Sequence, residues 1–249
     1  MDDKQLMRYK RHLLLPQIDV AGQQRLLNAS VLVVGSGGLG SPVLMYLVAA
    51  GVGKLHLYDD DTVEISNLQR QILFDSSTLG QSKAQAAVER LREINSDCKV
   101  VAEASRLEGD ALNTAVTDVD LVIDCSDNFH TRFAVNQACV KNRKTLVSGA
   151  VIRMEGQVSV FSGHDKEKPC YHCLYQPDAY DDETCTSSGV LGPAAGVIGS
   201  LLATEAVKLI AGIGDSLEGR LLLFDAMAMR FNELKLKKDP ACPVCGLES

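Results

Sequence analysis

Three glycines that follow a short apolar run form a motif able to bind a nucleotide. The stretch VLVVGSGGLGSP, residues 31–42, places Gly35, Gly37 and Gly40 in the spacing G-x-G-x-x-G between an expected strand and an expected helix. Backbone N–H groups at the start of a helix attract phosphate. Asp59 ends the second expected strand, where an acidic side chain can bond a ribose hydroxyl. These features alone describe a dehydrogenase equally well.

Two cations and two carboxylates extend this motif beyond a dinucleotide site. Arg70 follows the second expected strand and Lys83 begins the next expected helix. A triphosphate carries charge that must be held, and its leaving pyrophosphate must be stabilised. Asp124 and Asp127 lie at the carboxyl end of the fourth expected strand, where a carboxylate could hold Mg²⁺. Asp124 could instead cap a helix or form part of a turn, and Arg70 and Lys83 could be ordinary surface charges.

Four cysteines occur as two C-x-x-C pairs, a pattern typical of a tetrahedral structural zinc site. The pairs are Cys170 with Cys173 and Cys242 with Cys245. Because residues 174–241 separate the pairs, the metal would join two distant segments. Four unrelated thiols, or one redox pair, are the alternatives.

The remaining cysteines divide into two groups. Cys98, Cys125 and Cys139 lie in apolar or helical surroundings, so we expect them to be buried packing residues. Cys185 lies in the polar segment 163–189, which is rich in Pro and Gly and is expected to form a crossover loop or lid.

Composition limits the class of protein. The 249 residues are 46% hydrophobic, enough for one large α/β domain. A net charge of −7 gives no electrostatic support for general nucleic-acid binding. The N-terminus lacks the order of a signal peptide, and we expect no apolar run to approach the roughly 18 residues of a membrane helix. We therefore expect a cytoplasmic protein that binds neither nucleic acid nor a membrane.

Alternating strands and helices are expected to position the chemical groups. The expected strands are 31–35, 54–61, 98–104, 119–127 and 145–150. The expected helices between them are 41–53, 82–95, 109–116 and 129–142. This order predicts an α/β fold with a Rossmann-like, doubly wound, mainly parallel sheet.

The flanking segments complete the expected fold. Segments 156–163 and 220–237 alternate in polarity and predict antiparallel C-terminal strands near the sheet edge. Segment 192–212 is rich in small residues and predicts a buried helix that could also lie at a subunit interface. A helix with four cations is expected over 2–15.

Several motifs, spread over nearly the whole chain, resemble those of one enzyme family. They are RYKRHLLL, GSGGLGSP, YDDDTVEISNLQRQILF, GQSKA, DCSDNFHTR, GAVIRMEGQVSVF, PCYHC and CPVCG. The chain resembles the MoeB/ThiF/HesA family of bacterial adenylyltransferases, which activate ubiquitin-like sulfur-carrier proteins and are relatives of the ubiquitin-activating enzymes. Within this family, SGAVIRMEGQ is more similar to enzymes that serve molybdopterin synthase than to those of the thiazole pathway.

The resemblance implies a reaction and its partners. The C-terminal glycine carboxylate of a carrier that ends in Gly-Gly would attack the α-phosphate of MgATP, giving an acyl-adenylate and pyrophosphate. Because a carboxylate is ionised near pH 7, no general base is required. The resemblance further implies Zn²⁺, a homodimer, and a separate sulfur donor such as a cysteine desulfurase or sulfurtransferase.

The resemblance also implies roles for individual residues. The positions that would contact the nucleotide are Gly38, Asp59, Ser66, Asn67, Leu68, Gln69, Arg70, Lys83, Asp127 and Asn128. Lys83 and Arg70 would act on the phosphates, Asp127 would bind Mg²⁺, and Arg11 would reach the ATP of the neighbouring subunit. The four cysteines of the C-x-x-C pairs match the family's zinc ligands.

Cys185 aligns with a loop cysteine that some relatives use as a nucleophile. Its acidic neighbours at 181–183 would raise its pKa and disfavour the thiolate. A cysteine without an essential role is therefore the alternative.

We expect a single domain over 1–249 with three parts. Residues 1–29 would form a helical arm, 30–150 the nucleotide-binding core, and 151–249 a part that binds the carrier and is joined by zinc. An NAD-dependent oxidoreductase would explain the glycine motif and Asp59, but not Arg70, Lys83 and Asp127 together. A binding scaffold without catalysis is a third possibility.

Overall fold

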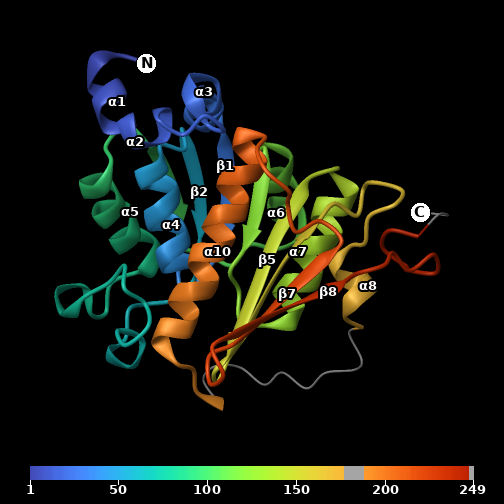
Figure 1. Cartoon of the computed structure of the whole chain (residues 1–249). Coiled ribbons are helices and arrows are strands. Elements are labelled where there is room, and N and C mark those ends of the chain that lie inside the picture. The colour runs from blue at the N-terminus through green and yellow to red at the C-terminus, as the bar shows by residue number, and fades with distance from the viewer. Residues whose placement is uncertain (177–187, 247–249) are drawn as a thin grey trace.

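An eight-stranded sheet forms the centre of the computed structural model, which describes residues 1–176 and 188–246 (Figure 1). The strand order is β3-β2-β1-β4-β5-β6-β7-β8. The first five strands in the chain are β1 (Ser30–Val34), β2 (Lys54–Tyr58), β3 (Lys99–Glu103), β4 (Leu121–Asp124) and β5 (Thr145–Ile152). The last three are β6 (Glu155–Phe161), β7 (Arg220–Asp225) and β8 (Arg230–Lys235).

The sheet has a parallel half and an antiparallel half, as the sequence predicted. Strands β3, β2, β1, β4 and β5 pair in parallel, whereas β5 to β8 pair as antiparallel neighbours. Val34 at the end of β1 aligns with Tyr58 of β2 and Asp124 of β4. The carboxyl ends of these three strands therefore meet at one edge, where doubly wound sheets bind ligands.

Helices cover both faces of the sheet (Figure 1). One face carries α3 (Asp19–Asn28), α4 (Gly40–Ala50), α5 (Lys83–Ile94) and α10 (Gly192–Ala211). The other carries α6 (Gly109–Thr117), α7 (Phe129–Lys141) and α8 (Tyr171–Leu174). Leu47 and Ile198 are fully buried in the first core, and Val116 and Val135 in the second.

The N-terminal arm is more broken than the sequence predicted. The expected helix over 2–15 divides at Tyr9 into α1 (Asp3–Arg8) and α2 (Lys10–Leu13), and α3 follows. Tyr9 is buried and accepts a 2.9 Å hydrogen bond from Asn95 Nδ2. Its ring lies against Gly51, the left-handed C-cap of α4, where a Cβ atom would stand 2.5 Å from the ring. The helix is interrupted at the residue whose ring makes this contact.

Helix α10 is longer and more apolar than the sequence analysis expected of any segment. By length and composition its 20 residues could cross a membrane, so the expectation that no apolar run is long enough was wrong. Half of the apolar window is nevertheless buried inside the protein, and the helix packs against α4, β5 and β6. Gly199 allows close approach, because a Cβ atom there would lie 2.4 Å from Pro42 Cγ. The predicted buried helix is confirmed.

Candidate functional site

The glycine loop lies between β1 and α4, at the edge where β1, β2 and β4 end. Gly35 has φ +90°, a left-handed backbone that favours glycine. A Cβ atom at Gly40 would stand 2.1 Å from the Gly35 carbonyl oxygen, so the loop closes only with glycine at this position. Gly37 and Gly38 line a pocket in front of α4. The loop thus presents backbone N–H groups and a helix start to the pocket.

Asp59 holds the glycine loop in this shape. Its Oδ2 accepts hydrogen bonds from the Ser36 backbone N and from Ser36 Oγ, each 2.7 Å long. Its Oδ1 accepts a 3.0 Å bond from the Asp61 backbone N. Asp59 also lines the pocket, as the sequence predicted, and Oδ1 keeps a lone pair for a further donor.

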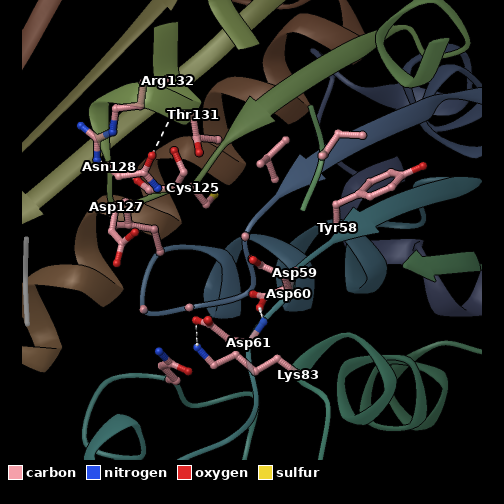
Figure 2. Close-up of a pocket in the computed structure, with 18 of the residues that line it drawn as sticks. Tyr58, Asp59, Asp60, Asp61, Lys83, Cys125, Asp127, Asn128, Thr131 and Arg132 are labelled. Atoms are coloured by element: carbon pink, nitrogen blue, oxygen red, sulfur yellow. Dashed lines mark hydrogen bonds and ion pairs between the residues drawn. The ribbon is translucent and has the colours of Figure 1, made fainter. Parts of the chain in front are cut away.

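Lys83 enters the pocket as an almost completely buried cation. It is the first residue of α5, and its backbone N donates to the Asp61 carbonyl oxygen over 3.0 Å. Its Nζ lies 2.8 Å from Asp61 Oδ2, and Figure 2 shows the two side chains meeting below the glycine loop. The Lys83 side chain is 5% exposed, whereas that of Asp61 is 68% exposed.

Arg70 lies in the segment that links β2 to α5, and its side chain packs against the glycine loop. A Cβ atom at Gly38 would lie 3.3 Å from Arg70 Cγ, and Arg70 Nη1 donates to the Ser66 carbonyl oxygen over 3.1 Å. Arg70 and Lys83 both line the pocket. The two cations predicted from the sequence therefore converge on the loop that can hold phosphate.

Asp127 and Asn128 form the opposite side of the pocket, at the end of β4 (Figure 2). Asp127 is exposed. Asn128 caps α7, because its Oδ1 accepts a 2.9 Å bond from the Thr131 backbone N. Asp124 is fully buried, and its Oδ1 accepts bonds from Ser126 N and Oγ, so the turn alternative describes its local role.

Some predicted site residues lie outside the pocket wall in this single chain. Residues 66–69 belong to the segment that leads to Arg70, and Gln69 packs against the start of α10 at Gly192. Arg11 lies in α2, beside the C-terminal end of α4 and far from the glycine loop at the start of α4 (Figure 1). Cys185 falls outside the described residues. The nucleotide contacts of Ser66, Asn67, Leu68 and Gln69, and the role of Arg11, stay predictions.

The structure adds pocket residues that sequence reasoning missed. They are Val34, Leu39, Tyr58, Asp60, Asp61, Gln71, Ser105, Arg106, Leu107, Cys125, Ser126, Thr131, Arg132, Val151, Val190 and Ala195. Gln71 is the neighbour of Arg70 in SNLQRQ, and Arg132 ends DCSDNFHTR, so the motifs held a signal for both. Ser105 to Leu107 follow β3, and only the sheet order brings them to the pocket.

Four cysteines form a compact cluster away from the pocket. Their sulfur atoms all lie within 4.8 Å of one another. Cys170 Sγ is 3.7 Å from Cys242 Sγ, and Cys173 Sγ is 3.5 Å from Cys245 Sγ. Three of the four side chains are buried. Because four sulfur ligands at this spacing suit tetrahedral zinc, the residues fit the predicted metal.

Hydrogen bonds within the cysteine cluster shift the pKa values of its thiols. A hydrogen bond between the Cys170 and Cys173 thiols raises the pKa of Cys170 and lowers the pKa of Cys173. The Asp239 backbone N also donates to Cys173 Sγ over 3.4 Å. A thiolate therefore forms first at Cys173, and thiolates are the form that binds metal.

The other predicted packing cysteines, Cys98, Cys125 and Cys139, are all buried. Burial raises the pKa of Cys98 to about 12 and also raises the pKa values of Cys125 and Cys139. The prediction that they pack inside the protein is confirmed.

Comparison with protein families identifies the chain. The model of the ThiF family matches residues 9–244. The chain belongs to the ThiF family. This agrees with the resemblance found in the sequence motifs.

Relatives match this ThiF-family chain over nearly its whole length. A molybdopterin-synthase adenylyltransferase of Salmonella typhimurium is 44% identical over 246 residues, which cover 99% of this chain and 98% of the relative. A sulfur carrier protein adenylyltransferase of Thermus thermophilus is 46% identical, with 98% and 92% covered. A sulfur carrier protein ThiS adenylyltransferase of Escherichia coli is 43% identical, with 99% and 97% covered.

Solved structures share the fold. One structure of E. coli MccB has a TM-score of 0.84 and 22% identity, covering 99% of this chain and 74% of MccB. PaaA has a TM-score of 0.81 and 21% identity, covering 96% of this chain and 76% of PaaA. The fold of this ThiF-family member is therefore the fold of these proteins.

Proposed function

We propose that this protein is an ATP-dependent adenylyltransferase that activates the C-terminal glycine carboxylate of a ubiquitin-like sulfur carrier. The observation that carries the proposal is one pocket that unites the glycine loop with Arg70, Lys83 and Asp127. Two cations and a carboxylate around a phosphate-binding loop suit a magnesium triphosphate. Membership of the ThiF family and the names of the relatives support the same reaction.

The chemistry requires alignment and charge stabilisation rather than a base. The carrier's carboxylate is already ionised near pH 7 and can attack the α-phosphate directly. The glycine loop and the start of α4 would hold the phosphates through backbone N–H groups. Lys83 and Arg70 would stabilise the charge that develops on the leaving pyrophosphate.

Asp127 and Asn128 are the residues that we propose to hold Mg²⁺. Both present oxygen atoms, the ligand type that this ion prefers, at the pocket wall opposite Lys83. When bound, the ion would neutralise phosphate charge during transfer. The exposed Asp127 carboxylate fits this role, because it can reach a ligand without breaking a buried contact.

Asp59 is proposed to act on both the loop and the nucleotide. Its Oδ2 is occupied by Ser36, whereas Oδ1 accepts from Asp61 and keeps one lone pair. A ribose hydroxyl can donate to that lone pair. The same carboxylate would then fix the glycine loop and orient the sugar.

The carrier is proposed to approach along the antiparallel half of the sheet, within residues 151–249. The turn between β7 and β8 exposes Met227 and Met229, each by about three quarters. This turn lies beside the β5–β6 turn, because the Ala226 backbone N donates to the Met154 carbonyl oxygen. Val151, just before that turn, lines the pocket. An apolar surface therefore lies close to the pocket entrance.

The pathway and assembly are proposed from the sequence motifs and the relatives. SGAVIRMEGQ favours the carrier of molybdopterin synthesis, and the thiazole-pathway carrier is the second candidate, since relatives of the two kinds are 44% and 43% identical. Zn²⁺ at the four cysteines, a homodimer, a separate sulfur donor and a cytoplasmic location complete the proposal.

ATP–pyrophosphate exchange tests the proposal. Purified protein with Mg²⁺ is assayed with two carriers that end in Gly-Gly, one from each pathway, and with each carrier lacking its last glycine as the control. Exchange with one intact carrier supports adenylation and identifies the pathway. Nucleotide binding without exchange would favour the scaffold, and hydride transfer from a nicotinamide cofactor would favour the oxidoreductase.

A further inference from the structure

Ser126 is held from three directions beside the pocket. Its backbone N and its Oγ donate to Asp124 Oδ1 over 3.0 and 2.6 Å. Its carbonyl oxygen accepts a 2.7 Å bond from Arg132 Nη2. Asp124 is fully buried, and Ser126 and Arg132 are 9% and 8% exposed. We refer to Asp124, Ser126 and Arg132 as the Ser126 clamp.

The Ser126 clamp contains two buried opposite charges. Burying a carboxylate and a guanidinium costs several kcal/mol per ion, so such pairs persist only with compensating bonds. Here both charged groups bond to the same residue, and the Arg132 guanidinium also lies 5.9 Å from the centre of the Phe129 ring. Asp124 therefore binds the N–H and hydroxyl of Ser126, while Arg132 binds its carbonyl oxygen.

The backbone on the other side of Asp127 is fixed as well. Asn128 is the N-cap of α7, and its Oδ1 accepts from the Thr131 backbone N. Asp127 therefore lies between two anchored residues while its own side chain is exposed at the pocket. Figure 2 shows Asp127 and Asn128 on the side of the pocket that also carries Arg132.

We propose that Arg132 and Asp124 are positioning residues for the divalent cation of the reaction, acting through Ser126 to place the Asp127 carboxylate. The inference rests on the proposed function, because it takes Asp127 as the ligand of Mg²⁺. Residues that orient a metal ligand without touching the metal commonly change metal affinity by about 10- to 100-fold when they are replaced. The clamp should therefore control the Mg²⁺ requirement more than the maximal rate.

The first experiment measures the Mg²⁺ dependence of ATP–pyrophosphate exchange. Arg132→Met removes the bond to the Ser126 carbonyl oxygen, and Arg132→Lys keeps the charge with fewer donors. For Arg132→Met we expect the half-saturating Mg²⁺ concentration to rise about tenfold or more, with kcat at saturating Mg²⁺ within about threefold of wild type. Arg132→Lys should restore part of the Mg²⁺ affinity.

Arg25 provides the matched control. Like Arg132, it donates to a backbone carbonyl oxygen, that of Ala211, but it does so from α3, away from the pocket. Arg25→Met should leave the Mg²⁺ dependence unchanged. Ser126→Ala removes only the Oγ bond and is the milder variant, so a several-fold loss of Mg²⁺ affinity is expected even where Arg132→Met does not fold.

The second experiment separates this inference from the proposed function. Binding of Mn²⁺ in the presence of ATP, measured by electron paramagnetic resonance without any carrier, needs no turnover. Weaker Mn²⁺ binding in Arg132→Met and Ser126→Ala supports the clamp even if wild type shows no exchange with either carrier. Unchanged Mn²⁺ affinity, an equal loss in Arg25→Met, or a loss of ATP affinity without Mn²⁺ would overturn the inference; the last result would place Arg132 on the nucleotide itself.

Discussion

Lys83 and Asp61 form an ion pair in which the cation is buried and the carboxylate faces solvent, with Nζ 2.8 Å from Oδ2. The pair is set by the backbone, because the Lys83 N–H donates to the Asp61 carbonyl oxygen. Asp61 therefore holds the Lys83 ammonium group at the pocket. Because Asp61 is exposed, an anion of higher charge can displace it from Lys83. A phosphate group that enters the pocket can replace Asp61 as the partner.

Replacement of Lys83 is expected to abolish most of the exchange activity. Lys83→Met keeps the length of the side chain and removes its charge, so stabilisation of the leaving pyrophosphate is lost. A fall of about 100-fold or more in kcat/KM for ATP is expected, which corresponds to about 3 kcal/mol of transition-state stabilisation.

Asp61→Asn is the companion variant in the same assay. It removes the charged partner and keeps the shape, so a smaller loss, about tenfold at most, is expected. If Lys83→Met retained near-normal kcat/KM, the assignment of Lys83 to the phosphates would be wrong. A thermal melt of both variants checks that the fold is intact.

Arg11 offers a prediction about assembly. Its helix α2 lies beside the far end of α4 from the glycine loop, so Arg11 is remote from the pocket of its own chain. If Arg11 reaches the pocket of a neighbouring subunit, Arg11→Ala should be inactive alone. Mixing Arg11→Ala subunits with Lys83→Met subunits should then restore part of the exchange, because one pocket of each mixed dimer holds both wild-type residues.

The control for this experiment is each inactive variant incubated with itself. Recovery only in the mixture supports a shared site. A fully active Arg11→Ala, or an inactive mixture in which mixed dimers are demonstrated by mass, would contradict the role of Arg11.

The sequence predicted the fold well where local signals were strong. Apolar runs gave the strands, and the glycine at each end of α4 marked its limits, because Gly40 contacts Gly35 and Gly51 adopts a left-handed cap. The prediction of one N-terminal helix failed at Tyr9. That helix divides there because the Tyr9 ring packs on Gly51, at the end of α4. No local pattern reports such a contact.

In the candidate site too, residues with a local sequence signal were predictable and residues brought in by distant contacts were not. Asp59 and Asp127 were predictable because each lies just after a strand end, and Arg70 and Lys83 because they stand in the motifs SNLQRQ and GQSKA. Ser105 to Leu107 were not predictable, since they reach the pocket only through the place of β3 in the sheet. The meeting of the two C-x-x-C motifs was predictable, because four thiolates suit one zinc ion. Their spacing in the sequence did not predict how the two segments approach each other.

Loss of one cysteine from the cluster should release its metal. Cys242→Ser removes one of four sulfur atoms that lie within 4.8 Å, so zinc content should fall from about one per chain toward zero. The melting temperature should fall too, because a structural metal stabilises only the folded chain. Elemental analysis and calorimetry measure both effects.

Cys139→Ser is the matched control for the metal. Cys139 is buried outside the cluster, so its replacement should lower stability while leaving the zinc content unchanged. Equal metal content in Cys242→Ser and wild type would contradict the zinc assignment.

The buried thiols outside the cluster should resist alkylation. Burial raises the pKa of Cys98 to about 12, so at pH 8 only about one molecule in 10,000 carries the reactive thiolate there. Cys125 lines the pocket, but burial raises its pKa well above the ordinary value, so it should not react either. Mass mapping after iodoacetamide treatment should find both labelled in urea and neither labelled in the native protein.

The outcome bears on how the pocket works. Rapid native labelling of Cys125 would show a thiolate at the pocket wall and would contradict the raised pKa. Protection of Cys125 would mean that the described residues of the pocket offer no reactive thiolate, in agreement with direct attack by the carrier's carboxylate.

The exposed turn between β7 and β8 should contribute to carrier binding. Met229 is 74% exposed at this turn, so Met229→Glu costs little stability but places a charge on an apolar surface. We expect the KM for the carrier to rise about tenfold or more, with the KM for ATP unchanged, since one desolvated charge at an interface costs at least about 1.4 kcal/mol. Leu79→Glu, also at an exposed apolar residue but outside the turn, is the control and should leave both constants unchanged. Equal carrier KM values for Met229→Glu and wild type would mean that the carrier docks elsewhere, because a contact through this turn cannot accept a buried, unpaired carboxylate without loss of affinity.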